Sequence, residues 1–229
     1  MYNPFKHLKP HEWGLWGLSL SVVTAANLWV KGTDWLTTVS TLIGVTALIF
    51  VAKGDVWGQV LTVVFSILYA VTSYQFRYYG EMLTYVGMTA PIAALSVITW
   101  LRHPYKRGKN EVKIHRLTTR QTVWMWVLTA MATGGFGTML WWLETPNLVF
   151  SILSITTSFL ASYLMLYRHP FYAIAYAGND VVLIILWILA SIEDSAYLPM
   201  VLCFLMFLVN DMYGFVSWKR REIKQQKGL

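Results

Sequence analysis

Apolar residues fill long runs of this chain, and short polar connections separate one run from the next. An α-helix rises 1.5 Å per residue, so a run of about 20 apolar residues crosses a hydrocarbon core about 30 Å thick. The pattern predicts an all-α, polytopic membrane protein with about eight transmembrane helices. The predicted spans are residues 13–30, 35–52, 56–74, 82–101, 122–142, 148–167, 171–191 and 197–217.

Composition excludes a water-soluble domain. Of the 229 residues, 56% are apolar and 13% are charged, and the mean hydropathy is +0.49. A soluble domain carries roughly 25% charged residues. The predicted spans also take up most of the chain, so no separate soluble domain is expected, and the lipid bilayer is the expected surrounding.

Several kinds of chemistry have no signature in the sequence. The single cysteine, Cys203, lies within a predicted span, and all five histidines lie between the spans. This distribution argues against an intramolecular disulfide and against a metal site. The sequence contains no phosphate-binding loop, no HExxH motif and no Gly-x-Ser-x-Gly elbow. We therefore expect no catalytic residue, no metal and no cofactor, and the chain is not expected to be an enzyme.

The net charge of +7 gives an orientation for the predicted spans. Basic residues cluster in the connection 102–121 and in the tail 219–229. When both clusters are placed in the cytoplasm, all 18 lysines and arginines except Lys31 and Arg77 lie on that side. The charge thus predicts two cytoplasmic termini in a bacterial inner membrane, and it favours lipid headgroups over nucleic acid as the partner. Most tryptophans, including Trp100 and Trp218, are interpreted as lying at the membrane interface.

The spacing of the spans predicts an internal repeat. Spans five to eight follow spans one to four at a nearly constant offset and run in the same direction. We divide the chain into a first helical repeat (1–101), a cytoplasmic basic loop (102–121), a second repeat (122–218) and a cytoplasmic tail (219–229). Parallel repeats occur in transporters whose substrate site lies between the two halves.

Two carboxylates lie well inside the predicted spans. Asp180 and Asp211 each follow an asparagine, Asn179 and Asn210. Ionisable residues in hydrocarbon are costly and usually face a cavity or a partner. At 1.5 Å per residue the two Asn-Asp pairs lie at nearly the same depth in consecutive antiparallel helices. We expect them to form one polar cluster.

The span 171–191 has an aromatic and polar face. At 100° per residue, Tyr172, Tyr176, Asn179 and Trp187 share one side of the helix, and Asp180 lies at its edge. Such a face is suited to stacking on a flat ring, binding its substituents and favouring a cation. The alternative is that these polar groups only tie neighbouring helices together. Gln59 lies near a span end and is either part of the site or interfacial.

Two further features are open to more than one interpretation. Serines at 151, 154, 158 and 162 form a stripe for which close helix packing is the favoured explanation over a wet path. Pro91 is expected to kink its helix, and a gate at this point is the alternative.

Four short stretches carry a resemblance to a known family. They are the YGEML sequence at 79–83, Trp100, the RHPF sequence at 168–171 and the NDVVLI sequence at 179–184. The chain resembles the Pnu family of bacterial vitamin transporters, in particular its PnuC-type nicotinamide riboside transporters. The resemblance implies a SWEET-like 3+1+3 core with an extra span and a site between two parallel repeats. It also implies facilitated diffusion, with the vitamin trapped through phosphorylation by a cytoplasmic riboside kinase.

One departure from the family pattern leaves the vitamin open. Nicotinamide riboside members commonly carry Trp-x-x-Trp-x-x-x-Asn in this helix, whereas this chain has Tyr172, Ala175 and Asn179 at those positions. Thiamine and riboflavin are the alternatives within the family. The expected substrate-binding residues are Asn179, Tyr176, Tyr172, Trp187, Asp180, Asn210, Asp211 and Gln59.

Other hypotheses stay open at this stage. A proton-coupled symporter would use Asp180 or Asp211 as the proton carrier. A membrane enzyme or a scaffold is the alternative from another functional class. The sequence is also compatible with a homo-oligomer.

Overall fold

The computed structural model describes residues 3–30, 35–75, 78–106 and 111–228. Lys31 and Arg77, the two basic residues that the charge pattern places outside, lie beyond these described residues. The described helices are η1 (Pro4–His7), α1 (Pro10–Trp29), α2 (Trp35–Ala52), α3 (Val56–Gln75), α4 (Tyr79–Thr84), η2 (Tyr85–Thr89), α5 (Ala90–Arg102), α6 (Thr119–Trp142), α7 (Leu148–Leu166), α8 (Tyr172–Glu193), η3 (Ser195–Tyr197) and α9 (Leu198–Gln226).

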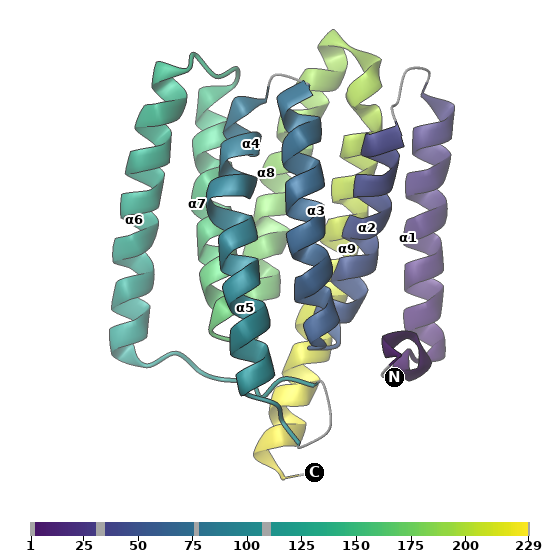
Figure 1. Ribbon diagram of the computed structural model, residues 1–229, viewed down its shortest axis with the longest axis vertical. Coiled ribbons are helices and arrows are strands. Elements are labelled where there is room, and N and C mark those ends of the chain that lie inside the picture. The colour runs from purple at the N-terminus through teal and green to yellow at the C-terminus, as the bar shows by residue number, and fades with distance from the viewer. Residues whose placement is uncertain (1–2, 31–34, 76–77, 107–110, 229) are drawn as a thin grey trace.

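The helices stand side by side in an up-and-down bundle (Figure 1). Both ends of the chain lie at the lower end of Figure 1, and the opposite end is called the upper end. Among the described residues, seven helical segments are long and apolar enough to cross a membrane; the continuous rod α4–η2–α5 counts as one. Helix α1 is the eighth long helix and is less apolar, yet it runs along α2 over a similar length (Figure 1). The all-α fold predicted from the apolar runs is confirmed.

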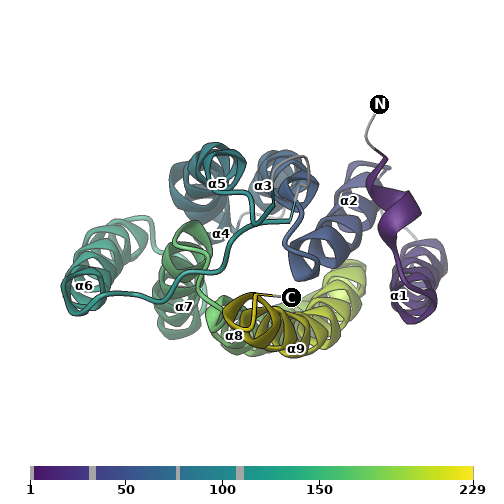
Figure 2. The ribbon, with the colours of Figure 1, turned by 90° about the horizontal axis from the view of Figure 1, so that it is seen from below.

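Six segments form a ring, and two helices flank it. Helix α2 packs against α3, α3 against α5, α5 against α7, α7 against α8, α8 against α9, and α9 against α2. Viewed from below in Figure 2, α1 and α6 lie at opposite sides of this ring. We call α2, α3 and α5 the first triple and α7, α8 and α9 the second. The last segment of each triple packs against the first segment of the other: α5 against α7, and α9 against α2. Helix α6 carries the chain back to the upper end, so both triples run in the same direction.

The lower end is held by side-chain bonds to backbone carbonyls. The indole of Trp218 donates to the carbonyl of Val51 at 2.9 Å, and the indole of Trp100 donates to the carbonyl of Met165 at 3.2 Å. Both indoles are fully buried. Trp100 lies near the end of α5, as expected, but its indole and that of Trp218 are buried between helices and bond backbone carbonyls rather than facing lipid. Exposed tryptophans such as Trp29 and Trp142 do lie at helix ends.

Candidate functional site

A small cavity lies inside the ring, between the two triples. Its lining comes from α2, α3, η2, α7, α8 and α9, and includes Gln59, Tyr85, Thr89, Tyr176, Asn179 and Asp180. The free volume is about 50 Å³. That volume holds a few water molecules, whereas pockets for drug-sized ligands measure roughly 300–1,000 Å³. The ring is therefore contracted around the cavity, and a larger molecule enters only when helices or side chains move apart.

Asn179 is held in place by hydroxyl groups of the neighbouring helix α7. Its Oδ1 lies 2.9 Å from the hydroxyl of Ser158 and 2.8 Å from the hydroxyl of Thr157. The Asn179 side chain is buried and lines the cavity. Two hydroxyls that fix the amide oxygen leave the amide N–H groups to bond whatever occupies the cavity. Asn179 is thus a positioned donor at the centre of the ring.

Three polar atoms on the cavity lining have no hydrogen-bond partner among the described residues. They are Nε2 of Gln59, Oγ1 of Thr89 and Oδ2 of Asp180. Buried polar atoms are almost always hydrogen-bonded, so each exception calls for an explanation. The three atoms belong to three different helical segments and border one space. Unpaired polar groups on several residues of one cavity are typical of a site that binds a polar molecule.

Two carboxyl groups meet at this cavity. Asp180 on α8 and Asp211 on α9 both line it, and their side chains interact directly with each other. Of the two Asn-Asp pairs expected to form one polar cluster, Asn179, Asp180 and Asp211 meet at the cavity. Asn210 instead faces α1, where its amide donates to Ser19. Two carboxylates in a low-dielectric site repel each other, so a cation in the cavity is electrostatically favoured. The alternative occupant of such a pair is a proton.

The rod α4–η2–α5 supplies two cavity residues that the sequence analysis missed, Tyr85 and Thr89. Pro91 lacks a backbone N–H, and its ring clashes with the carbonyl one turn earlier. The helix widens at that point into a π-helical turn, Tyr85–Thr89, in which the N–H of Ala90 reaches the carbonyl of Tyr85. Single π-turns are frequent at functional sites. The sequence signal was Pro91 inside an apolar run, but the kink alone does not tell which residues turn inward.

The structure brings five of the eight predicted site residues to the cavity and places three elsewhere. The five are Gln59, Tyr176, Asn179, Asp180 and Asp211.

The other three predicted site residues, Trp187, Tyr172 and Asn210, lie above, below and beside the cavity. Trp187 lies toward the upper end and donates to the hydroxyl of Tyr69 at 3.0 Å. Tyr172 packs on Trp218 at the lower end, with ring centroids 4.7 Å apart. Asn210 faces α1, where its amide donates to the hydroxyl of Ser19 at 2.9 Å.

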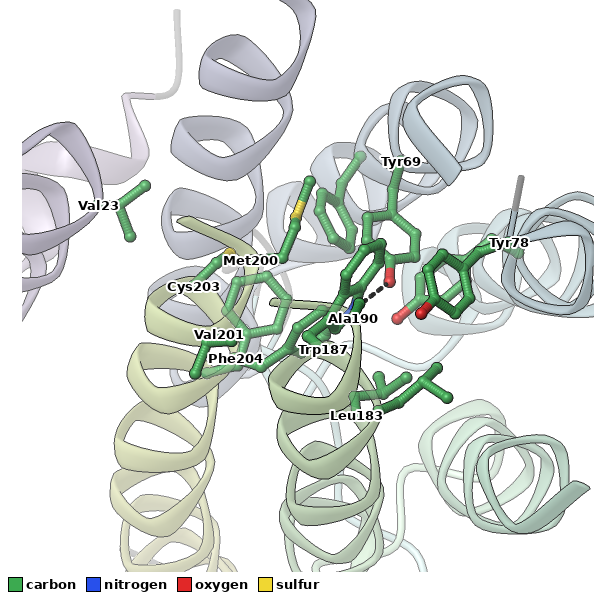
Figure 3. Close-up of a cluster of buried hydrophobic side chains, with 14 of the residues drawn as sticks. Val23, Tyr69, Tyr78, Leu183, Trp187, Ala190, Met200, Val201, Cys203 and Phe204 are labelled. Carbon is green, nitrogen blue, oxygen red and sulfur yellow. Dashed lines mark hydrogen bonds between the residues drawn. The ribbon is translucent and has the colours of Figure 1, made fainter. Parts of the chain in front are cut away.

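An aromatic layer closes the cavity toward the upper end. This upper closure consists of Tyr69, Tyr78, Tyr85, Trp187 and Tyr197. Tyr69 and Tyr85 have ring centroids 4.3 Å apart, and Tyr78 and Trp187 have centroids 4.8 Å apart. Figure 3 shows Tyr69 and Tyr78 next to Trp187, with the Tyr69–Trp187 hydrogen bond dashed.

A second layer closes the lower end. This lower closure consists of Trp100, Tyr172 and Trp218, together with Val112 from the connection before α6. The backbone N–H of Val112 donates to the carbonyl of Gly54 at 3.0 Å. Aromatic side chains therefore lie on both sides of the cavity, toward the upper and the lower end.

The serine stripe on α7 serves bonding rather than packing alone. Ser158 bonds Asn179, Ser162 shares a hydrogen bond of 3.0 Å with the hydroxyl of Tyr176, and Ser154 donates to Glu81 at 3.0 Å. The sequence analysis favoured close packing as the explanation. The observed contacts show instead that α7 positions the polar side chains of α8 and α4.

Comparisons with known proteins agree with this architecture. A sequence model of the family described as nicotinamide mononucleotide transporter matches residues 34–220. The match begins just before α2 and ends within α9, so it covers the ring and leaves α1 out.

Two relatives align over nearly the whole chain. One is the nicotinamide riboside transporter PnuC of Neisseria mucosa, 26% identical over 95% of this chain and 84% of the relative. The other is the nicotinamide riboside transporter PnuC of Haemophilus influenzae, 23% identical over 93% of this chain and 91% of the relative.

A solved structure shares the fold. It is described as the crystal structure of the vitamin B3 transporter PnuC, and it superposes with a TM-score of 0.82 at 23% identity. The superposition covers 95% of this chain and 94% of that one. From the family match over most of its length, this chain belongs to the nicotinamide mononucleotide transporter family of multi-pass membrane proteins.

Proposed function

We propose that this protein takes up nicotinamide riboside across a bacterial cytoplasmic membrane by facilitated diffusion. The names of its two aligned relatives support this substrate. The observation that carries the proposal is the set of donors, acceptors and carboxylates that meet at the central cavity. A nicotinamide riboside offers a flat cationic ring, a carboxamide and ribose hydroxyls, and each has a complementary group there.

Each lining group has a role in this proposal. The amide of Asn179 binds the carboxamide, and Tyr176 and Tyr85 lie along the ring. Asp180 and Asp211 offset the positive charge. The Nε2 of Gln59, which has no partner among the described residues, donates to a ribose hydroxyl.

The lower end faces the cytoplasm in this proposal. All four ion pairs among the described residues join elements of that end, which include the N-terminal turn of α1 and the last turns of α9. Both termini lie there as well (Figure 1). This agrees with the preference of basic residues for the cytoplasmic side. A cytoplasmic kinase that phosphorylates the riboside then keeps it inside the cell and makes uptake one-way.

Asn179→Ala tests the site, with Asn210→Ala as the matched control. Both asparagines are buried, each precedes an aspartate, and they lie on adjacent helices, but only Asn179 lines the cavity. In proteoliposomes, we expect nicotinamide riboside uptake by Asn179→Ala to fall about 100-fold, which corresponds to about 2.8 kcal/mol. Asn210→Ala is expected to retain uptake. Equal uptake by the two variants would remove Asn179 from the site.

Binding titrations distinguish the vitamin. A ligand that binds the folded protein raises its melting temperature by mass action. We expect nicotinamide riboside to raise it, and thiamine and riboflavin to leave it unchanged. A response to thiamine or riboflavin alone would keep the transport class and replace the substrate.

The contact between Asp180 and Asp211 favours one second candidate, proton-coupled symport. Under that mechanism, a riboside analogue that cannot be phosphorylated accumulates in vesicles with a proton gradient, and an ionophore abolishes the accumulation. Facilitated diffusion predicts equilibration with or without the gradient. A membrane enzyme or a scaffold predicts no flux at all.

A further inference from the structure

Glu81 is a buried carboxylate that the proposed site does not use. It lies on α4, is 1% exposed, and accepts one hydrogen bond of 3.0 Å from Ser154 through Oε1. Its Oε2 has no hydrogen-bond partner among the described residues. None of the ion pairs formed by the described residues includes it. A carboxylate at this depth without a cation is costly, and such residues usually mark an ion or substrate pathway.

Three tyrosines of the upper closure lie near this carboxylate. Tyr69, Tyr78 and Tyr85 all lie close enough to Glu81 to interact with it electrostatically. Trp187 contacts two of these rings, through its hydrogen bond to Tyr69 and a tilted ring contact with Tyr78. Aromatic faces joined by a carboxylate form the arrangement that recognises organic cations. Glu81 thus lies within electrostatic range of several aromatic rings at the upper closure.

The position of Glu81 relates it to the central cavity. Ser154 lies one helical turn above Ser158 on α7, and Glu81 lies about one turn above Tyr85 on its own rod. Ser158 and Tyr85 both line the cavity, while Ser154 and Glu81 do not. The Glu81 carboxylate is therefore about one helical turn above the cavity, at the level of the upper closure. Glu81 thus lies between the upper end of the ring and the cavity.

We propose that Glu81 is a second cation-binding residue, one turn above the central cavity, that selects positively charged rings over neutral ones on the way in. This proposal rests on the proposed function, because it takes the substrate to be a cationic riboside. Its chemical target is the pyridinium ring rather than the carboxamide or the ribose. The competing explanation is structural: Glu81 only ties α4 to α7 through Ser154.

Charge selectivity separates these explanations. Glu81→Gln keeps the size of the side chain and an oxygen for Ser154, and it removes the charge while replacing the unpaired oxygen with an amide NH2. Uptake is measured in proteoliposomes for nicotinamide riboside and for its reduced 1,4-dihydro form, whose ring is neutral. We expect Glu81→Gln to lower the ratio of cation to neutral uptake about tenfold. An unchanged ratio would overturn the role of Glu81, whether uptake of both forms falls together or stays the same.

Ser154→Ala is the matched control. It breaks the hydrogen bond between α7 and α4 but leaves the charge on Glu81. We expect the ratio of cation to neutral uptake to stay at the wild-type value. A ratio in Ser154→Ala that falls as in Glu81→Gln would show that the tie to α7, not the charge, sets the preference. If Glu81→Gln does not insert, Glu81→Met takes its place, because an apolar side chain of similar size leaves no polar atom to satisfy.

The two proposals fail separately. If the wild-type protein carries nicotinamide riboside and the ratio is unchanged in Glu81→Gln, only the role of Glu81 is overturned. If the wild-type protein carries thiamine and riboflavin instead, these two supply the cationic and the neutral ring for the same comparison. Absence of flux for all of these vitamins overturns both proposals.

Discussion

The two ends of the ring close the cavity with different kinds of contact. At the lower end, Trp218 and Trp100 donate to backbone carbonyls of other helices. At the upper end, Trp187 donates to the side chain of Tyr69, and Ser154 donates to the side chain of Glu81. A backbone carbonyl moves only with its helix, whereas side chains change rotamer without moving the backbone. In the contracted state seen here, the upper end is therefore the easier one to open.

The ends also differ in their electrostatics. Four ion pairs among the described residues hold the lower end, including Lys53–Glu12 at 2.8 Å and Arg221–Glu111 at 2.9 Å. The upper closure consists of aromatic rings. Ion pairs near water respond to pH and salt, while aromatic packing responds little to either. Each end can thus be perturbed without the other.

The largest expected effect is on stability. Trp218→Ala and Trp187→Ala each empty the space of a fully buried indole, and such changes cost about 3–5 kcal/mol. We expect Trp218→Ala to lower the melting temperature more, because side chains of the upper closure relax into a gap more easily than a contact fixed to a backbone carbonyl. Thermal unfolding of the two detergent-purified variants makes the comparison. A larger loss in Trp187→Ala would contradict the difference between the ends.

A smaller effect is expected from removing one hydrogen bond. Trp187→Phe keeps an aromatic ring and loses the bond to Tyr69, worth about 1 kcal/mol net, which corresponds to about fivefold more of the open form. In a Cys203→Ala background, a cysteine at Thr62 on the cavity lining should react about fivefold faster with an impermeant maleimide added at the upper end.

Trp218→Phe provides the matched control for that experiment. It removes the bond to the carbonyl of Val51 at the opposite end of the ring. We expect its reaction rate with the maleimide from the upper end to equal that of the parent. Faster labelling in both variants would show that the two closures open together.

The smallest expected effect is a pH dependence confined to the lower end. Burial disfavours the charge on Glu12, but hydrogen bonds from Lys53, from the backbone N–H of Lys9 and from Tyr213 outweigh it and lower the pKa of this carboxyl from its ordinary 4.5. A lowered pKa stabilises the fold above the unfolded pKa, and the gain is lost as the pH falls through the folded pKa.

We therefore expect wild-type protein to be more stable than Glu12→Gln by about 1 kcal/mol at neutral pH. The difference should shrink below pH 4.5. Melting temperatures of both proteins from pH 7 down to pH 3 measure it. A difference in melting temperature between wild type and Glu12→Gln that stays constant from pH 7 to pH 3 would refute the proposed stabilisation by Glu12.

The fold could be predicted because length and apolarity decide which segments cross a membrane. One face of α8 could also be predicted, since 3.6-residue periodicity groups Tyr176, Asn179 and Asp180 by geometry alone. All three line the cavity. Periodicity says which residues share a face, but it does not say at which depth the cavity lies. For that reason Tyr172 and Trp187 were grouped with Asn179, although they lie in the lower and upper closures.

Glu81 was missed for a different physical reason. The apolar run was taken to begin at residue 82, which placed the carboxylate just outside the membrane. In the structure the helix begins at Tyr79, and Glu81 is buried against Ser154. A polar residue at the start of an apolar run is compatible with a position at the membrane surface or inside the bundle. The serine that bonds it lies on α7, at a distance in sequence that no local pattern joins to it.

The π-helical turn Tyr85–Thr89 inserts one extra residue into the middle of the rod α4–η2–α5. If this turn tightens into ordinary α-helix, the rod shifts its register by one residue, which rotates one half against the other by about 100° and displaces it by about 1.5 Å. A rotation of the half Tyr79–Thr84 would carry Glu81 away from Ser154. A one-residue change in the turn beside the cavity would thus reorient the Glu81 carboxylate one turn above it.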